Sequence, residues 1–118
     1  MTTLALDRTE VIARLNDRAR LGFDRSARTV ITRNCLAAFG DVSGPQAIVN
    51  QAQLLAAMRR CRFAPDSPER DFGVFEFSGQ TVWVKVDYYD SDCAYGSEDP
   101  TDPAVTTRVV TILLPADY

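Results

Sequence analysis

The 118-residue chain contains no histidine, and this absence excludes several kinds of site. Ser-His-Asp and Cys-His catalysis both need an imidazole as the general base. Three cysteines are too few for a structural zinc site made of four thiolates, and His-containing zinc sites cannot form. A glycine-rich phosphate loop is also absent, because Gly-Lys-Ser and Gly-Lys-Thr do not occur. The sequence therefore favours a binding protein over an enzyme, and we expect no catalytic residue and no cofactor.

The chain is also poor in features of secreted and membrane proteins. Cys35, Cys61 and Cys93 are widely spaced without a Cys-x-x-Cys pair, which is typical of free, buried thiols in a reducing compartment. Its apolar runs are far shorter than the roughly 20 residues of a membrane helix, and the first residues do not resemble a signal peptide. We expect one cytoplasmic domain over residues 1–118 without membrane contact, with an ordinary globular composition of 46% hydrophobic and 25% charged residues.

The net charge of −3 hides an uneven distribution along the chain. Residues 1–62 contain ten arginines and five acidic residues, whereas residues 63–118 contain eleven acidic residues and three basic ones. Such asymmetry indicates either a charged partner or two halves that neutralise each other in the folded domain.

Helical signals dominate the first half of the sequence. Asp7 followed three residues later by Glu10 resembles a capping box and predicts a helix from Arg8 to Leu21, ended by Gly22. A β-rich run from Thr29 to Thr32 predicts a first strand.

A second helix is predicted from Pro45 to Arg60, with Ser43 as its cap. Apolar residues at helical spacing predict its buried side, namely Ile48, Ala52, Leu55 and Ala56.

The second half has the alternation of strands. Residues 72–77 and 81–89 flank Ser78-Gly79, which predicts a β-hairpin with Phe75 facing Val82 and Gly73 facing Val84. The predicted helix-facing side is nearly all apolar: Phe75, Phe77, Val82, Val84, Val86 and Tyr88. The other side mixes aromatic and charged residues: Phe72, Val74, Glu76, Trp83, Lys85, Asp87 and Tyr89. With a last strand over 105–114, the order α-β-α-β-β-β predicts an α+β fold, a mostly antiparallel sheet of three or four strands with two helices packed on one face.

An acidic segment follows the long strand, and its interpretation stays open. The acidic residues without an intervening basic one are Asp87, Asp90, Asp92, Glu98, Asp99 and Asp102. Oxygen ligands at this density are compatible with a divalent-metal-binding module or metal-dependent hydrolase built on Asp87, Asp90 and Asp92. Alternatively, the two Asp-Pro pairs at 99–100 and 102–103 build turns, with the carboxylates accepting hydrogen bonds from backbone amides.

Two further surfaces have competing interpretations. Trp83, with Phe72, Val74 and Tyr89, is either an anchor for a protein partner or is covered by loops of the chain itself. The arginines of the first helix, Arg14, Arg18 and Arg20, are compatible with phosphate contacts in a DNA-binding accessory protein. The low isoelectric point of about 4.8 argues against direct nucleic-acid binding.

Several short motifs match one family. They are the run from Ile12 to Asp17, Asp71-Phe72-Gly73, Asp87-Tyr88-Tyr89-Asp90, Tyr95-Gly96-Ser97, the two Asp-Pro pairs and Thr107-Arg108-Val109. With these motifs the chain resembles a family of small bacterial proteins catalogued as domain of unknown function 3768. The resemblance implies a product of plasmids or other mobile elements, encoded near antirestriction genes, and it brings no catalytic residue with it.

These observations predict a non-enzymatic anti-defence inhibitor, either anti-CRISPR or antirestriction. The expected partner is a nucleic-acid-processing host defence complex, whose phosphate-binding arginines and lysines the acidic segment would occupy; a homodimer is compatible with the sequence. The predicted partner-binding residues are Trp83, Asp87, Tyr89, Asp90, Asp92, Tyr95, Glu98, Asp99, Asp102 and Arg108.

Overall fold

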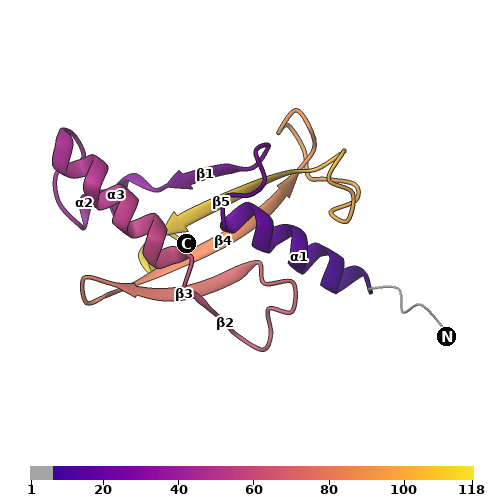
Figure 1. Cartoon of the computed structure of the whole chain (residues 1–118), viewed down its shortest axis with the longest axis horizontal. Helices are drawn as coiled ribbons and strands as arrows, with labels where there is room; N and C mark the ends of the chain where they lie inside the picture. Colours follow the sequence, from indigo (N-terminus) through magenta and orange to yellow (C-terminus); the bar gives the residue numbers. More distant parts are fainter. Residues whose placement is uncertain (1–6) are drawn as a thin grey trace.

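A computed structural model describes residues 7–118, and Figure 1 shows α1 and α3 crossing in front of a twisted sheet. This part of the chain forms three α-helices and five strands, followed by a final 3-10 turn. The elements in chain order are α1 (Arg8–Arg20), β1 (Arg28–Ile31), α2 (Arg33–Ala37), α3 (Pro45–Met58), β2 (Arg62–Phe63), β3 (Phe72–Phe77), β4 (Gln80–Tyr89), β5 (Thr107–Leu113) and η1 (Pro115–Asp117). The predicted α+β class is confirmed, although the numbers of strands and helices are larger than expected.

The sheet has the strand order β1-β5-β4-β3-β2 and is mixed. β1 runs parallel to β5, whereas the other three pairings are antiparallel. The prediction of a mostly antiparallel sheet did not include the parallel pair. β1 and β5 come from opposite ends of the chain, and their pairing depends on how the whole intervening chain folds. No local sequence pattern predicts it.

The register of the β3–β4 hairpin agrees with the prediction. Phe75 pairs with Val82 and Gly73 with Val84. Ser78 and Gly79 both have positive φ angles, 50° and 78°, as a two-residue type I′ turn requires. The turn fixes the register, and the register places the apolar set of each strand on the helix side.

α1 begins and ends as its sequence predicts. The Asp7 carboxylate accepts a hydrogen bond of 2.8 Å from the backbone N–H of Glu10, and the helix ends at Arg20. Arg14 pairs with Glu10 one turn earlier at 3.4 Å. Ile12 and Ala19 lie in the core.

Two predictions about the middle of the chain are wrong. Ser43 does not cap α3, because Gly44 is its N-cap, with φ at 88° and without a side-chain hydrogen bond. The predicted buried side is wrong except for Leu55, which packs against the core: the buried residues of α3 are Ala47, Leu54 and Met58, and Ile48 is 70% exposed. The short helix α2, which Thr32 caps through its hydroxyl, was not predicted at all.

The core lies between the helices and one face of the sheet. The strands supply Phe75, Val82, Val84, Val86, Val110 and Ile112, and the helices supply Ala19, Cys35, Leu54 and Met58.

All three cysteines are free as predicted, but only Cys35 is buried. Burial together with the charge of Asp117 raises the pKa of the Cys35 thiol to about 11. Among residues 7–118, no helix is long and apolar enough to cross a membrane.

Candidate functional site

The face of the sheet that points away from the helices carries a band of aromatic and charged side chains. Because side chains alternate along a strand, Trp83, Lys85, Asp87 and Tyr89 of β4 share this face. Phe72 packs against Trp83 edge to face, with ring centroids 5.1 Å apart. We call this surface the helix-free face.

The C-terminal residues lie over one part of the helix-free face. The Tyr118 ring contacts Trp83 and Phe72, with centroid distances of 5.8 and 6.0 Å, while its own side chain stays 79% exposed. The Asp117 carboxylate holds this end in place by accepting hydrogen bonds from Thr32 Oγ1 at 2.7 Å, Asn34 Nδ2 at 2.9 Å and the backbone N–H of Leu114 at 3.0 Å. The chain's own C-terminus therefore covers part of Trp83.

Acid should detach this C-terminal cover. The hydrogen bonds from Thr32, Asn34 and Leu114 hold the pKa of Asp117 below its ordinary value. A lowered pKa stabilises the attachment at neutral pH, and this stabilisation is lost as the pH falls below about 3.8 and through the lowered value. In acid, the fluorescence emission of Trp83, the only tryptophan, should therefore shift to the red, because its indole becomes more exposed to water. Asp117→Ala should give the same red shift at pH 7. Asp41→Ala, an exposed aspartate elsewhere, should leave the emission unchanged; unchanged emission in Asp117→Ala would contradict the attachment.

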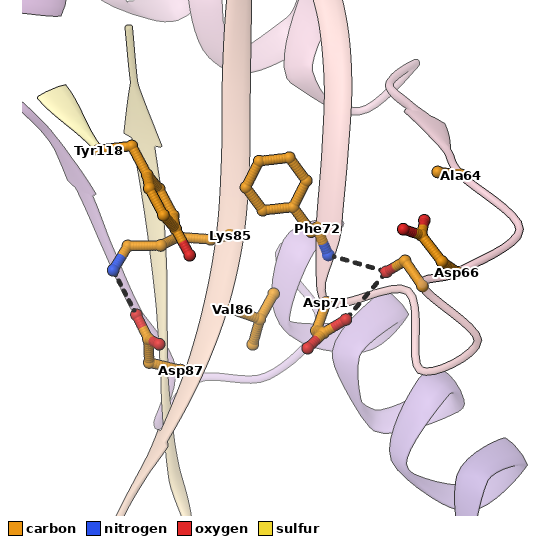
Figure 2. Close-up of a pocket in the computed structure, with 9 residues that line it drawn as sticks. Ala64, Asp66, Asp71, Phe72, Lys85, Val86, Asp87 and Tyr118 are labelled. Carbon is orange, nitrogen blue, oxygen red and sulfur yellow. Dashed lines mark hydrogen bonds and ion pairs between the residues drawn. The ribbon is translucent and has the colours of Figure 1, made fainter. Parts of the chain in front are cut away.

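Two shallow recesses flank Tyr118 on the helix-free face. The first, about 350 Å³ in volume, lies between β3, β4 and the 64–71 loop, and the second, about 390 Å³, lies over β4 and β5. Both are lined by Lys85, Asp87 and Tyr118. Figure 2 shows Lys85 turned toward Asp87, with 3.1 Å between Nζ and the nearer carboxylate oxygen. In the first recess Ser67 Oγ donates to Asp71 at 2.9 Å and accepts from the backbone N–H of Phe72.

An acidic recess adjoins the helix-free face where β4 ends. It has a volume of about 410 Å³, and its lining includes Asp90, Asp92, Tyr95 and Glu98. Tyr95 is 78% exposed, and Asp92 and Glu98 are also exposed. Tyr89 lines a recess of the helix-free face and Asp90 lines the acidic recess, so the two surfaces are continuous along the chain.

Backbone hydrogen bonds organise the segment around the acidic recess. The carboxylates of Asp90, Asp99 and Asp102 each accept a backbone N–H two to four residues later, at 2.9 to 3.1 Å. The Thr101 hydroxyl also donates to Asp99, and this bond is the first cause that lowers the pKa of Asp99. Arg8 of α1 pairs with the same carboxylate at 3.0 Å. The prediction of aspartate-capped turns at both Asp-Pro pairs is confirmed.

A buried arginine fastens this segment to the core. Arg108 of β5 is 1% exposed; it donates from Nε to Asn16 Oδ1 at 2.7 Å and from a terminal nitrogen to the Pro100 carbonyl. Its guanidinium lies 5.1 Å from the centre of the Tyr88 ring. Asn16 in turn donates to the Tyr88 hydroxyl at 2.7 Å, and that hydroxyl donates to Glu69 at 2.9 Å. Burial lowers the pKa of Arg108 and raises that of Tyr88. This network therefore connects α1, β4, β5 and the acidic segment.

The predicted site residues fall into separate groups. Trp83, Asp87 and Tyr89 lie on the helix-free face, whereas Asp90, Asp92, Tyr95 and Glu98 line the acidic recess. Asp99 and Asp102 are held in turns.

Arg108 needs correction, because it is buried on the helix side and cannot contact a partner directly. Its position in the strand indicated this burial, since residues two apart share one side of a strand and Arg108 is therefore on the same side as the core residues Val110 and Ile112. Tyr118 was missed at this site, and a terminal tyrosine has no periodic pattern that would place it.

The structure also bears on the two alternative sites, the metal site and the arginines of α1. In the described part of the chain, no three Asp, Glu, Cys or His side chains are grouped so that they could hold one metal ion. Of the α1 arginines, Arg14 pairs with Glu10, and Arg20 is 9% exposed and bonded to Asp17 and the Arg59 carbonyl. Arg18 is exposed, and its side chain donates a long hydrogen bond, 3.4 Å, to the Phe23 carbonyl.

Comparison with known proteins places the chain in a family. No curated protein and no solved structure matches it. A family model matches residues 39–117, which is more than half of the chain and includes the helix-free face and the acidic recess. The chain belongs to the family described as protein of unknown function DUF3768.

Proposed function

We propose that this protein is a non-enzymatic inhibitor, made by a mobile element, that binds a nucleic-acid-processing protein of a host defence system such as CRISPR or restriction. The contact surface is the acidic recess together with the adjoining helix-free face. Exposed carboxylates there take the place of phosphates in a basic groove, while Tyr95 and Tyr89 add aromatic contact area. Aromatic side chains carry much of the binding energy in protein interfaces.

One observation carries this proposal: the acidic segment is held in a fixed shape before any partner binds. Three of its aspartates are used in turns, and Arg8 and Arg108 tie it to α1 and β5. The exposed carboxylates of Asp92 and Glu98 remain directed to solvent beside the recess. A preorganised surface loses less conformational entropy on binding, which favours affinity.

The test is a plasmid-transformation assay in cells with and without an active restriction or CRISPR system. Expression of the wild-type protein should raise transformation only where the defence system is present. Asp92→Lys and Glu98→Lys should each lower this protection at least about tenfold, because each places a positive charge against a basic groove, where juxtaposed like charges cost several kcal/mol. In purified form the inhibition should weaken with salt, since exposed charges are screened over ~8 Å at physiological ionic strength.

The matched control is Asp41→Lys, the same charge reversal at an exposed position. Asp41 belongs to the connection between α2 and α3, and Figure 1 shows that this connection and the acidic segment lie at opposite ends of the molecule. Asp41→Lys should protect as well as the wild type. Equal protection by Asp92→Lys, Glu98→Lys and the wild type would remove the acidic recess from the mechanism.

A further inference from the structure

The outward side of α3 carries a row of exposed apolar side chains. The helix packs on the sheet through Ala47, Leu54 and Met58. Residues on the opposite side of an α-helix recur every three or four positions. A row of exposed apolar side chains lies there, with Ile48 at 70% and Val49 at 46%, and the exposed glutamines Gln46 and Gln53 border it. We define the α3 stripe as Pro45, Ile48, Val49, Ala52 and Ala56.

The α3 stripe also lies in a stretch without charge. Every residue from Val42 to Met58 is uncharged, although 25% of the chain is charged. The outer side of a surface helix is normally polar or charged. A groove of about 440 Å³ lies beside the stripe, and its lining includes Leu36 and Val42. Large exposed apolar patches on soluble proteins mark interaction sites.

We propose that the α3 stripe is the contact between two copies of this chain, packed antiparallel about a twofold axis near Ala52. In such a contact the residues near the axis meet their own copies, so a charge there would meet a like charge. A charge-free stripe avoids this repulsion. With the axis at Ala52, Ile48 lies opposite Ala56 of the second copy, so that a large side chain meets a small one.

The charges at the two ends of α3 favour the antiparallel direction. Arg59 and Arg60 follow the helix and are exposed, and Asp41 precedes it and is exposed. Antiparallel packing brings the arginines of one copy toward the aspartate of the other, and such opposite charges fix the orientation of an interface. Parallel packing would place the arginines of both copies together.

This contact is independent of the proposed inhibitory surface. The structure is 54 Å long, and in Figure 1 α2 and the start of α3 lie at one end while the acidic segment lies at the other. A dimer through α3 leaves both acidic recesses open. One face of a 14-residue helix, about 21 Å long, is small for an interface, so we expect association on the order of micromolar or weaker.

Sedimentation equilibrium of the full chain, from micromolar to millimolar concentration, tests the dimer. The mass should rise from the 13.1 kDa of one chain toward about twice that value. Ala52→Glu should keep the mass of one chain throughout, because it places two like charges at the axis. Ala104→Glu, the same substitution at an exposed position in the acidic segment, should associate like the wild type. A wild type that stays monomeric, or an Ala52→Glu variant that still associates, overturns the proposal.

A second measurement needs no variant and serves if Ala52→Glu fails to fold. Hydrogen exchange of the wild-type amides in α3 should slow as the protein concentration rises, because association buries the stripe. Exchange in α3 that is independent of concentration overturns the proposal, since it means that the stripe is free or is covered within one chain.

Discussion

Replacing Arg108 by alanine should lower the free energy of unfolding by about 3 kcal/mol, within the range for large-to-small changes at buried sites. The side chain fills space between α1 and β5, so its truncation leaves a cavity. It also leaves Asn16 Oδ1 and the Pro100 carbonyl without their donors, and a buried polar group without a partner costs about 1–3 kcal/mol. Urea unfolding followed by circular dichroism measures the loss as a shift of the midpoint at constant slope.

Arg108→Met separates packing from hydrogen bonding. Methionine fills much of the same volume but donates no hydrogen bond, so the expected loss is about 1–2 kcal/mol, smaller than for alanine. In both variants the amides of the 96–106 segment should exchange faster, because the tie to the Pro100 carbonyl is lost. A methionine variant as stable as the wild type, with unchanged exchange in this segment, would show that the buried hydrogen bonds do not hold the acidic segment.

The same arginine shows where the sequence contained a usable signal that was interpreted wrongly. Arg108 was included among the predicted partner-binding residues, yet it lies two and four residues before Val110 and Ile112, on the same side of the strand, and therefore points into the core. Charge predicts exposure on average, but the strand period decides the direction of a side chain. Its partner Asn16 is 92 residues away, and the Pro100 carbonyl belongs to a loop whose path no local pattern fixes, so neither hydrogen bond could be predicted.

Local patterns predicted the hairpin and the turns correctly, because their determinants are adjacent in sequence. The Ser78-Gly79 turn fixes the β3–β4 register, and the Asp-Pro pairs build turns within a few residues. The prediction of which side of α3 is buried failed for a physical reason. This helix has two apolar sides, and helical periodicity cannot tell which side faces the sheet. The stripe predicted as core and the stripe proposed as an interface share Ile48, Ala52 and Ala56.

The pairing of β1 with β5 and the position of Tyr118 over Trp83 depend on contacts between distant parts of the chain. Such contacts shape the helix-free face. The sequence therefore predicted which residues of β4 lie on this face, but not that Tyr118 lies over Trp83. The acidic residues of the segment are evident from the sequence, whereas its attachment through Arg8 and Arg108 emerged only from the folded chain. Its role in partner binding stays a prediction.

Gly73→Ala should destabilise the fold by about 1–3 kcal/mol, the usual cost of overpacking a filled site. Gly73 lies on β3, between β2 and β4, and a Cβ atom there would come within 2.8 Å of Cys61 Sγ and 3.1 Å of a Phe63 ring carbon. Both distances are shorter than ordinary van der Waals contacts, so the side chains of Cys61 and Phe63 must shift. Urea midpoints of the wild type and the variant measure the cost.

A double-mutant cycle with Cys61→Ala identifies the cause of this cost. Removing Sγ eliminates the shortest contact, so Gly73→Ala should cost about 1 kcal/mol less in the Cys61→Ala background than in the wild type, a coupling typical of residues in contact. Gly96→Ala is the matched control, because the nearest atom to its new Cβ, the Tyr88 carbonyl oxygen, lies 3.9 Å away, and its stability should stay within about 0.5 kcal/mol of the wild type. If the cost of Gly73→Ala is the same in both backgrounds, close packing against Cys61 is not what requires glycine at this position.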